Sequence, residues 1–235
     1  MKSYCNKLGL ETGLVSGLRD NPYFSLYFSR LIRKKLLAEL RLGKNDRAEE
    51  TLFLYLGGMK DYARLTLNYP ITNRLFWYFS GEYAIFRAQD ETRIGQGTNL
   101  YGELSYKLRV GYPDYTLRVY TNYGNYSEKN SKGVLQKVSP FLDFKALPED
   151  FLVFGAGLLF GYENRYSFVR VWRPFMSLDL GYNTGIDGFF FGSSLGIGGL
   201  IFGQDNLSLS VDYAENMGGV KEGIFNLNLL YRRWY

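Results

Sequence analysis

Hydrophobic and polar residues alternate along most of this chain with a period of two. In the segment 23–30, for example, one row of alternate positions holds Phe24, Leu26 and Phe28, and the row between them begins with Ser25. Neighbouring side chains of a strand point to opposite faces of the sheet. The pattern therefore predicts β-strands that each have one apolar and one polar face.

About twelve segments show this alternation, which predicts an all-β, antiparallel protein. The segments are 8–18, 23–30, 36–42, 63–69, 75–85, 100–110, 117–123, 152–160, 176–182, 189–198, 207–214 and 222–235. Many of them span about 9–11 residues, which is enough to cross a bilayer as a tilted strand. The stretch 33–42 is also compatible with a helix, because KKLLAELRL contains good helix formers.

The connections between these segments alternate in length. Short turns are expected at 31–35, 70–74, 111–115 and 203–206, and longer polar loops at 44–60, 88–98, 127–150 and 214–222. Short turns on one side and long loops on the other are typical of outer-membrane barrels. The connection 163–171 departs from this pattern, because it falls on the side of the short turns but is itself long.

The last segment, 222–235, has the pattern of the closing strand of an outer-membrane barrel. Its apolar row contains the residues that we interpret as an assembly signal, namely Leu227, Leu229, Tyr231 and the terminal Tyr235. Arg233 interrupts this row, but a long cationic side chain at a membrane boundary can reach the headgroups. Taken alone, the segment fits an amphipathic strand of a soluble sheet better than a barrel strand, so the rest of the chain has to decide.

Composition agrees with a membrane barrel more than with a helical membrane protein. The 235 residues are 46% hydrophobic and 18% aromatic, with Gly 27 against Pro 6. Mean hydropathy is −0.21 and no run of 18 apolar residues occurs, which excludes a transmembrane helix. We predict an antiparallel transmembrane β-barrel formed by a single domain over residues 1–235, as part of a larger barrel.

Residue types exclude several classes of function. The net charge of +5 is spread along the chain and forms no basic stripe, so nucleic-acid binding is not predicted. With His 0 and one cysteine, Cys5, the chain lacks the usual general base and zinc ligands. No catalytic motif is present. The glycine-rich segment Gly196 to Gly199 resembles a phosphate-binding loop only superficially, because it lies inside an alternating strand. We expect neither an enzyme nor a cofactor nor a metal site.

The polar rows carry many charges of both signs, which suits a hydrated lumen. Our candidates for contact with a transported polymer are the charged residues Glu82, Glu103, Arg118, Asp179 and Asp212 and the aromatic residues Tyr78, Tyr101 and Tyr120. The alternatives are a solvated face of a β-sandwich for the charges and simple packing for the aromatic rings. Glycines on the polar rows, such as Gly155 and Gly157, relieve crowding or bend the strands.

The N-terminal residues lack the basic region, apolar core and cleavage site of a secretory signal. An outer-membrane protein needs such a signal. Either this chain is the C-terminal part of a longer exported protein, or the interpretation as a membrane barrel is wrong.

Several short motifs resemble one known family over most of the chain. They are Gly57-Gly58-Met59, Thr92-Arg93 through Gly97, 112–118 (YPDYTLR), 147–151 (LPEDF), Arg173-Pro174-Phe175 and 203–209 (GQDNLSL). With these motifs, segments 59–120 and 172–213 resemble the C-terminal barrel of the PelB family of outer-membrane exporters of Pel exopolysaccharide.

This resemblance implies an outer-membrane pore that passes a biofilm exopolysaccharide, a Pel-like amino-sugar polymer, by passive translocation. It also implies that further strands of the barrel and a periplasmic repeat scaffold belong upstream of this chain. The implied partners are outer-membrane lipid, the exopolysaccharide, the barrel-assembly machinery and a periplasmic polysaccharide-modifying enzyme. The alternatives are a general small-solute porin and a soluble β-sheet binding module. Conductance in the presence of amino-sugar oligomers separates the first two, and solubility without detergent identifies the third.

Overall fold

A computed structural model describes residues 6–32, 35–137, 144–162, 171–202, 205–216 and 223–233. The chain divides into two compact units. Unit 1 comprises residues 1–70, 78–102 and 122–151, and unit 2 comprises residues 71–77, 103–121 and 152–235. A single domain over the whole chain stays a prediction.

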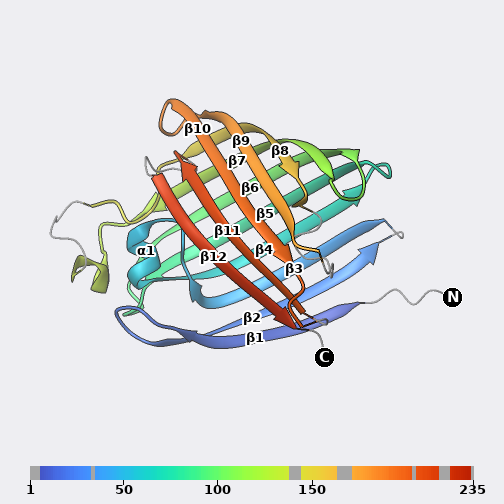
Figure 1. Ribbon diagram of the computed structural model, residues 1–235. Helices are drawn as coiled ribbons and strands as arrows, with labels where there is room; N and C mark the ends of the chain where they lie inside the picture. Colours follow the sequence, from blue (N-terminus) through green and yellow to red (C-terminus); the bar gives the residue numbers. More distant parts are fainter. Residues whose placement is uncertain are drawn as a thin grey trace. The chain divides into compact units, whose positions relative to one another are not determined.

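The described elements are almost entirely strands (Figure 1). They are β1 (Lys7–Val15), β2 (Asn21–Ile32), β3 (Leu36–Arg47), β4 (Gly58–Pro70), β5 (Leu75–Ala88), β6 (Arg93–Arg109), β7 (Tyr115–Glu128), β8 (Phe151–Phe160), β9 (Arg173–Asn183), β10 (Gly188–Gly199), β11 (Asp205–Glu215) and β12 (Gly223–Arg233). Two short helices, α1 (Leu52–Gly57) and the 3-10 helix η1 (Gly133–Lys137), interrupt them. No helix in the described ranges is long and apolar enough to cross a membrane.

The strands form a 12-stranded sheet in which sequence order is also spatial order. Pairing is antiparallel in β1–β2, β2–β3 and β3–β4 of unit 1, and in β8–β9 through β11–β12 of unit 2. The predicted all-β, antiparallel fold of about twelve strands is therefore confirmed. Strand order of this kind is that of an up-and-down meander, which needs only short connections between neighbours.

The structure settles several predictions about individual segments. The possible helix at 33–42 is wrong for its described part, because β3 begins at Leu36. The predicted loop 88–98 is wrong for residues 93–98, since β5 ends at Ala88 and β6 already begins at Arg93. Small residues there disguise a strand: a Cβ at Gly97 would lie 2.4 Å from the ring of Tyr126. Residues 203–204 of the predicted turn 203–206, residues 217–222 of the predicted loop 214–222, and Tyr235 lie outside the described residues.

The expected loops 44–60 and 127–150 contain ordered structure in unit 1. Thr51 caps the N-terminus of α1, where its hydroxyl accepts a hydrogen bond from the Leu54 N–H at 3.3 Å. The second predicted loop, 127–150, contains η1 and residues 144–149. We call α1, η1, residue 48 and residues 144–147 together the cap.

The cap builds the hydrophobic core of unit 1. Fully or almost fully buried residues of the cap are Leu54, Leu135 and Leu147, and they share one cluster with Tyr62 and Phe86 of the sheet. Tyr62 is in the same alternating row of β4 as Lys60 and Arg64, and Phe86 is in the same row of β5 as Glu82. The core thus lies on the polar side of these strands and covers it at one end.

Aromatic rings on the polar side lie over glycines of neighbouring strands. A Cβ at Gly43 would be 2.2 Å from the ring of Tyr62, and one at Gly196 would be 2.2 Å from the ring of Phe175. These close approaches explain why glycine is frequent in the polar rows. The glycines relieve crowding there, as one of the two sequence interpretations expected.

Candidate functional site

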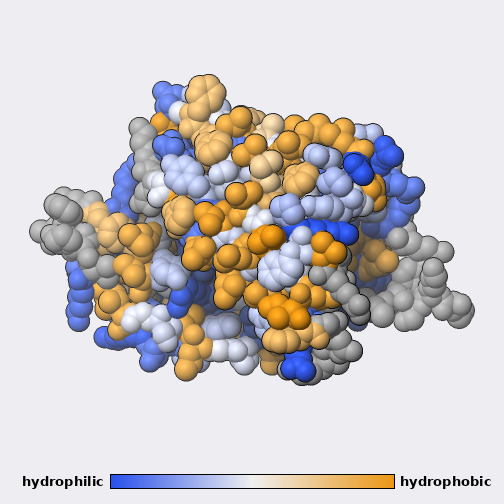
Figure 2. Space-filling model, viewed as in Figure 1, coloured by the Kyte–Doolittle hydropathy of each residue, from blue (hydrophilic) through white to orange (hydrophobic). Residues whose placement is uncertain are grey.

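Burial in this sheet is the reverse of that in a soluble protein. In β10, Ser194 is 6% exposed and the next residue, Leu195, is 63% exposed. In β9, Asp179 is 5% exposed and Leu180 is 60% exposed. Figure 2 shows apolar side chains, in orange, spread over the visible surface between polar areas. Polar residues are sheltered and apolar residues face outwards, which is the arrangement that a lipid environment stabilises.

In unit 2, three of the predicted site residues form one ionic cluster. Arg118 of β7 donates to Asp179 of β9 through Nε to Oδ1 at 3.0 Å and through Nη2 to Oδ2 at 2.7 Å. Its Nη1 lies 3.6 Å from Oε2 of Glu103 on β6. The paired, two-point geometry is the strongest form of an arginine–carboxylate contact.

Tyr120 belongs to the same cluster. The guanidinium of Arg118 lies 5.3 Å from the centre of the Tyr120 ring, within cation–π range. The ring lies over Gly155 of β8, where a Cβ would be only 2.5 Å away. Phe190 of β10 lies on another side, with ring centres 6.2 Å apart. Arg118, Gly155 and Phe190 thus surround this ring.

Asp212 of β11 connects three strands of unit 2. Its carboxylate accepts hydrogen bonds from the Ser194 hydroxyl on β10 and from the Asn228 amide on β12. Ser194 and Asp212 are direct cross-strand partners. This predicted site residue therefore lies on the polar side, as the alternation indicated.

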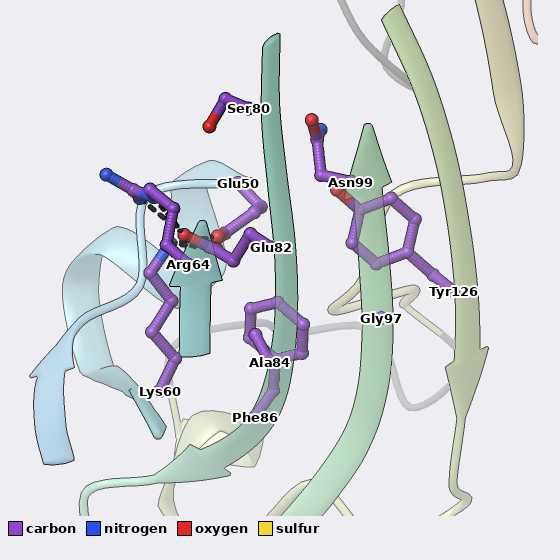
Figure 3. Close-up of a pocket in the computed structure, with 10 residues that line it drawn as sticks. All are labelled: Glu50, Lys60, Arg64, Ser80, Glu82, Ala84, Phe86, Gly97, Asn99 and Tyr126. Atoms are coloured by element: carbon purple, nitrogen blue, oxygen red, sulfur yellow. Dashed lines mark hydrogen bonds and ion pairs between the residues drawn. The ribbon is translucent and has the colours of Figure 1, made fainter. Parts of the chain in front are cut away.

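In unit 1, Glu82 of β5 is the centre of a second ionic network. The Lys60 ammonium lies 3.0 Å from Oε1 of Glu82 and 2.6 Å from Oε1 of Glu50. Arg64 donates from Nε to Oε2 of Glu82 at 2.7 Å. Figure 3 shows the four side chains converging, with Glu50 reaching in from the chain before α1. Lys60, Glu82 and Glu50 are mostly buried, whereas Arg64 is more open.

A cavity of about 250 Å³ adjoins this network. Its remaining polar lining comes from Ser80, Asn99 and Tyr126, which Figure 3 places around the same space. The cavity therefore offers charged groups of both signs, neutral hydrogen-bonding groups and an aromatic ring. Such a lining suits a hydrated, hydroxyl-rich ligand better than an apolar one.

The remaining aromatic candidates, Tyr78 of β5 and Tyr101 of β6, contact each other. Their ring centres are 5.8 Å apart and the ring planes meet at 65°. Both residues are only partly buried. An edge-to-face pair of this kind presents one ring face beside one ring edge.

The alternation identified the polar side correctly but missed two members of the network in unit 1. The predicted loop 44–60 includes Lys60, although β4 begins at Gly58. Glu50 lies outside any strand and no periodic signal marks it. For Lys60 a signal did exist, since it continues the row of Tyr62 and Arg64.

On β12, the described residues of the predicted assembly signal lie on the apolar side. Leu227 and Leu229 are about equally exposed, and Tyr231 is exposed as well. Tyr235 lies outside the described residues. Among the residues that the structure describes, no group of three or more His, Cys, Asp or Glu side chains is arranged to hold a metal ion.

Comparison with solved structures shows a similar fold. A bacterial polysaccharide outer membrane secretin matches with a TM-score of 0.72 and 11% identity, covering 100% of this chain and 77% of that chain. Pseudomonas aeruginosa OccK1 (OpdK) matches with a TM-score of 0.48 and 10% identity, covering 95% of this chain and 58% of that one. Among curated protein sequences, none matches this chain.

The family model described as "PelB, C-terminal beta barrel domain" matches residues 7–233. The match covers nearly the whole chain, and the fold agrees with it: antiparallel strands in sequence order, apolar side outwards. The resemblance noted in the sequence is thereby confirmed, and the chain is an outer-membrane β-barrel component. It belongs to the family of PelB C-terminal beta barrel domains.

Proposed function

We propose that this chain forms the wall of an outer-membrane pore through which a biofilm exopolysaccharide leaves the cell. The observation that carries the proposal is the reversed burial, in which Ser194 is sheltered and Leu195 is exposed. An apolar exterior fits lipid, and a polar interior fits a hydrated chain of sugars. The family and the similarity in fold to a protein described as a polysaccharide secretin support the same reading.

The charges on the polar side are arranged for passage of a polymer more than for tight binding. Arg118 pairs with Asp179, and Arg64 pairs with Glu82, so each carboxylate already has a cationic partner. A passing sugar exchanges hydrogen bonds with such paired groups without meeting an isolated charge. Passage is then passive, and we propose no catalytic step and no cofactor for this chain.

Within the Pel-like class, an amino-sugar polymer is the substrate we propose. Its ammonium groups are attracted to the carboxylates of Glu82, Glu103, Asp179 and Asp212, and its sugar rings slide over Tyr78, Tyr101 and Tyr120. The barrel-assembly machinery inserts the chain by recognising β12. A periplasmic polysaccharide-modifying enzyme delivers the polymer.

The test is to replace Glu82, Glu103, Asp179 and Asp212 together by their amides. We expect less secreted polymer, because the amides keep the shape of the side chains and remove the attraction for ammonium groups. A control with the same number of substitutions changes the exposed carboxylates Asp20, Glu49, Glu91 and Glu149. Heat-modifiable migration on gels reports assembly for both variants. Unchanged secretion by an assembled polar-side variant would sink the proposal.

A further inference from the structure

The polar side of unit 1 is closed at one end by the cap. Tyr62, Ala84 and Phe86 continue the rows of Lys60 and Glu82, yet each is nearly inaccessible, because Leu54 and Leu135 cover them. The cap does not cover the opposite row of β5, where the Tyr83 side chain is 46% exposed. Any polymer that follows the polar side of these strands meets the cap.

Leu54 packs in the core cluster, and a hydrogen bond and a cation–π contact also join the α1 part of the cap to neighbouring parts of unit 1. The Gln89 N–H donates to the Gly57 carbonyl at 2.9 Å, and the Arg47 guanidinium lies 5.0 Å from the centre of the Tyr55 ring. Within the cap, the Thr51 hydroxyl donates to the Ala146 carbonyl at 2.7 Å. The α1 helix has only six residues, too few to be stable without its packing contacts.

Lys60 makes the ionic connection between the α1 segment and the wall. Its ammonium lies between Glu50, which directly precedes the N-cap Thr51, and Glu82 of the neighbouring strand, at 2.6 and 3.0 Å. Removing the ammonium leaves Glu50 without this partner, whereas Glu82 keeps Arg64 at 2.7 Å. Losing the Lys60 bridge therefore weakens the attachment of the α1 segment and leaves Glu82 of β5 with a cationic partner.

We propose that α1 and its preceding residues form a lid, that Lys60 is the latch, and that an ammonium group of an amino-sugar polymer opens the lid by binding Glu50 in place of the Lys60 ammonium, which stays beside Glu82. The inference rests on the proposed function and names the chemistry of the opening step. The contacts of Lys60 show that these two carboxylates bind an ammonium group.

The cavity beside the latch gives the incoming group a place. It adjoins Glu50, Lys60 and Glu82, and Ser80, Asn99 and Tyr126 line its remaining polar part. A sugar ring in the cavity donates and accepts hydrogen bonds there while its ammonium approaches the carboxylates. Glu50 then has a cationic partner that is not attached to the strands, and the Lys60 ammonium keeps Glu82, so neither carboxylate is left without a cation.

Hydrogen exchange of the full chain in detergent micelles tests the lid directly. The informative amides are those of Leu54, Tyr55 and Gly58, which close α1 through Thr51 and the Leu54 carbonyl. In the Lys60→Met variant we expect exchange at these amides about tenfold faster, because a hydrogen bond to a charged group is lost at a partly buried site. Lys60→Arg retains a cation and should raise the exchange rate less.

Two comparisons make the test specific. Lys107→Met removes another strand lysine, whose ammonium lies 4.6 Å from the centre of the Phe76 ring, and should leave α1 exchange unchanged. A glucosamine oligomer added to the unaltered protein should accelerate α1 exchange, and an N-acetylglucosamine oligomer of equal length should not. Equal exchange in the Lys60→Met and Lys107→Met variants, or equal effects of the two oligomers, would overturn the proposal.

The exchange measurement needs no secretion, so it separates the lid from the proposed export. Loss of secretion in the four-carboxylate variant together with an unresponsive α1 would leave export supported and reject the lid. A responsive α1 with normal secretion in that variant would reject the proposed role of the carboxylates in export.

Discussion

Arg118 and Asp179 form a two-point salt bridge although a whole strand lies between them in the sheet. Arg118 is on β7 and Asp179 on β9, and the bridge crosses β8 at Gly157. A Cβ at Gly157 would lie 2.2 Å from Oδ1 of Asp179 and 2.9 Å from Nε of Arg118. Glycine at this position leaves the space through which the two side chains meet.

Replacing Gly157 by alanine should break this bridge. The added methyl group meets the carboxylate, the guanidinium and, at 3.0 Å, the Leu178 carbonyl, so the ionic pair has to give way. We expect the free energy of unfolding to fall by about 2 kcal/mol, the size of a charged hydrogen bond. Urea unfolding in micelles measures it. Gly188→Ala is the control, since its nearest neighbour lies 3.8 Å away; an equal loss there would contradict the explanation.

Glu82→Gln should destabilise unit 1, because Lys60 loses one carboxylate partner and Arg64 loses the one that it contacts at 2.7 Å. A loss of about 2 kcal/mol is expected for a mostly buried charged contact. The same unfolding measurement gives the value.

The control for this prediction is Glu149→Gln in the exposed residues after η1. A hydrogen bond from Lys145 lowers the pKa of Glu149, so the small contribution of this exposed pair to folding is present above the usual glutamate range and is lost as pH falls through it. Both side chains are exposed, and we expect no measurable change in stability from this substitution. A loss as large as that of Glu82→Gln would refute the role of burial.

Leu229→Lys on β12 should impair insertion, since this side chain is 70% exposed on the apolar side. A lysine facing lipid near the middle of a bilayer costs roughly 2–4 kcal/mol. The fraction of heat-modifiable protein in lipid vesicles reports the effect. Asn226→Lys places the same charge on the polar side, opposite Asp212, and should insert normally. If both variants insert equally well, our assignment of the two faces is wrong.

Removing both rings of the Tyr78–Tyr101 pair should slow export. With Tyr78→Ala and Tyr101→Ala together, we expect the amount of secreted polymer to decrease severalfold, because the aromatic surfaces on which sugar rings stack are lost. Phenylalanine at both positions should preserve export. Tyr83→Ala, on the opposite row of β5, is the matched control. Normal secretion from the double alanine variant, once assembly is verified, would reject a role in sliding.

Much of the fold follows from local pattern. Alternation placed Ser194 and Leu195 on opposite sides, and their burial differs accordingly. It also identified Asp179 and Asp212 as residues of the polar side. The segment 88–98 was misjudged because glycines and polar residues obscure the alternation where aromatic rings such as Tyr126 lie against the strand.

The sequence by itself determined most of the strands and their two faces, because these follow from the two-residue period of an extended chain, whereas burial in the structure decided that the apolar rows face outwards. The tertiary structure decided which charges meet. Arg118 finds Asp179, 61 positions away, and Lys60 joins Glu50 to Glu82. It also decided that the segment before β4 folds onto the polar side, because long-range burial of Leu54 and Leu135 on Phe86 leaves no periodic mark in the chain.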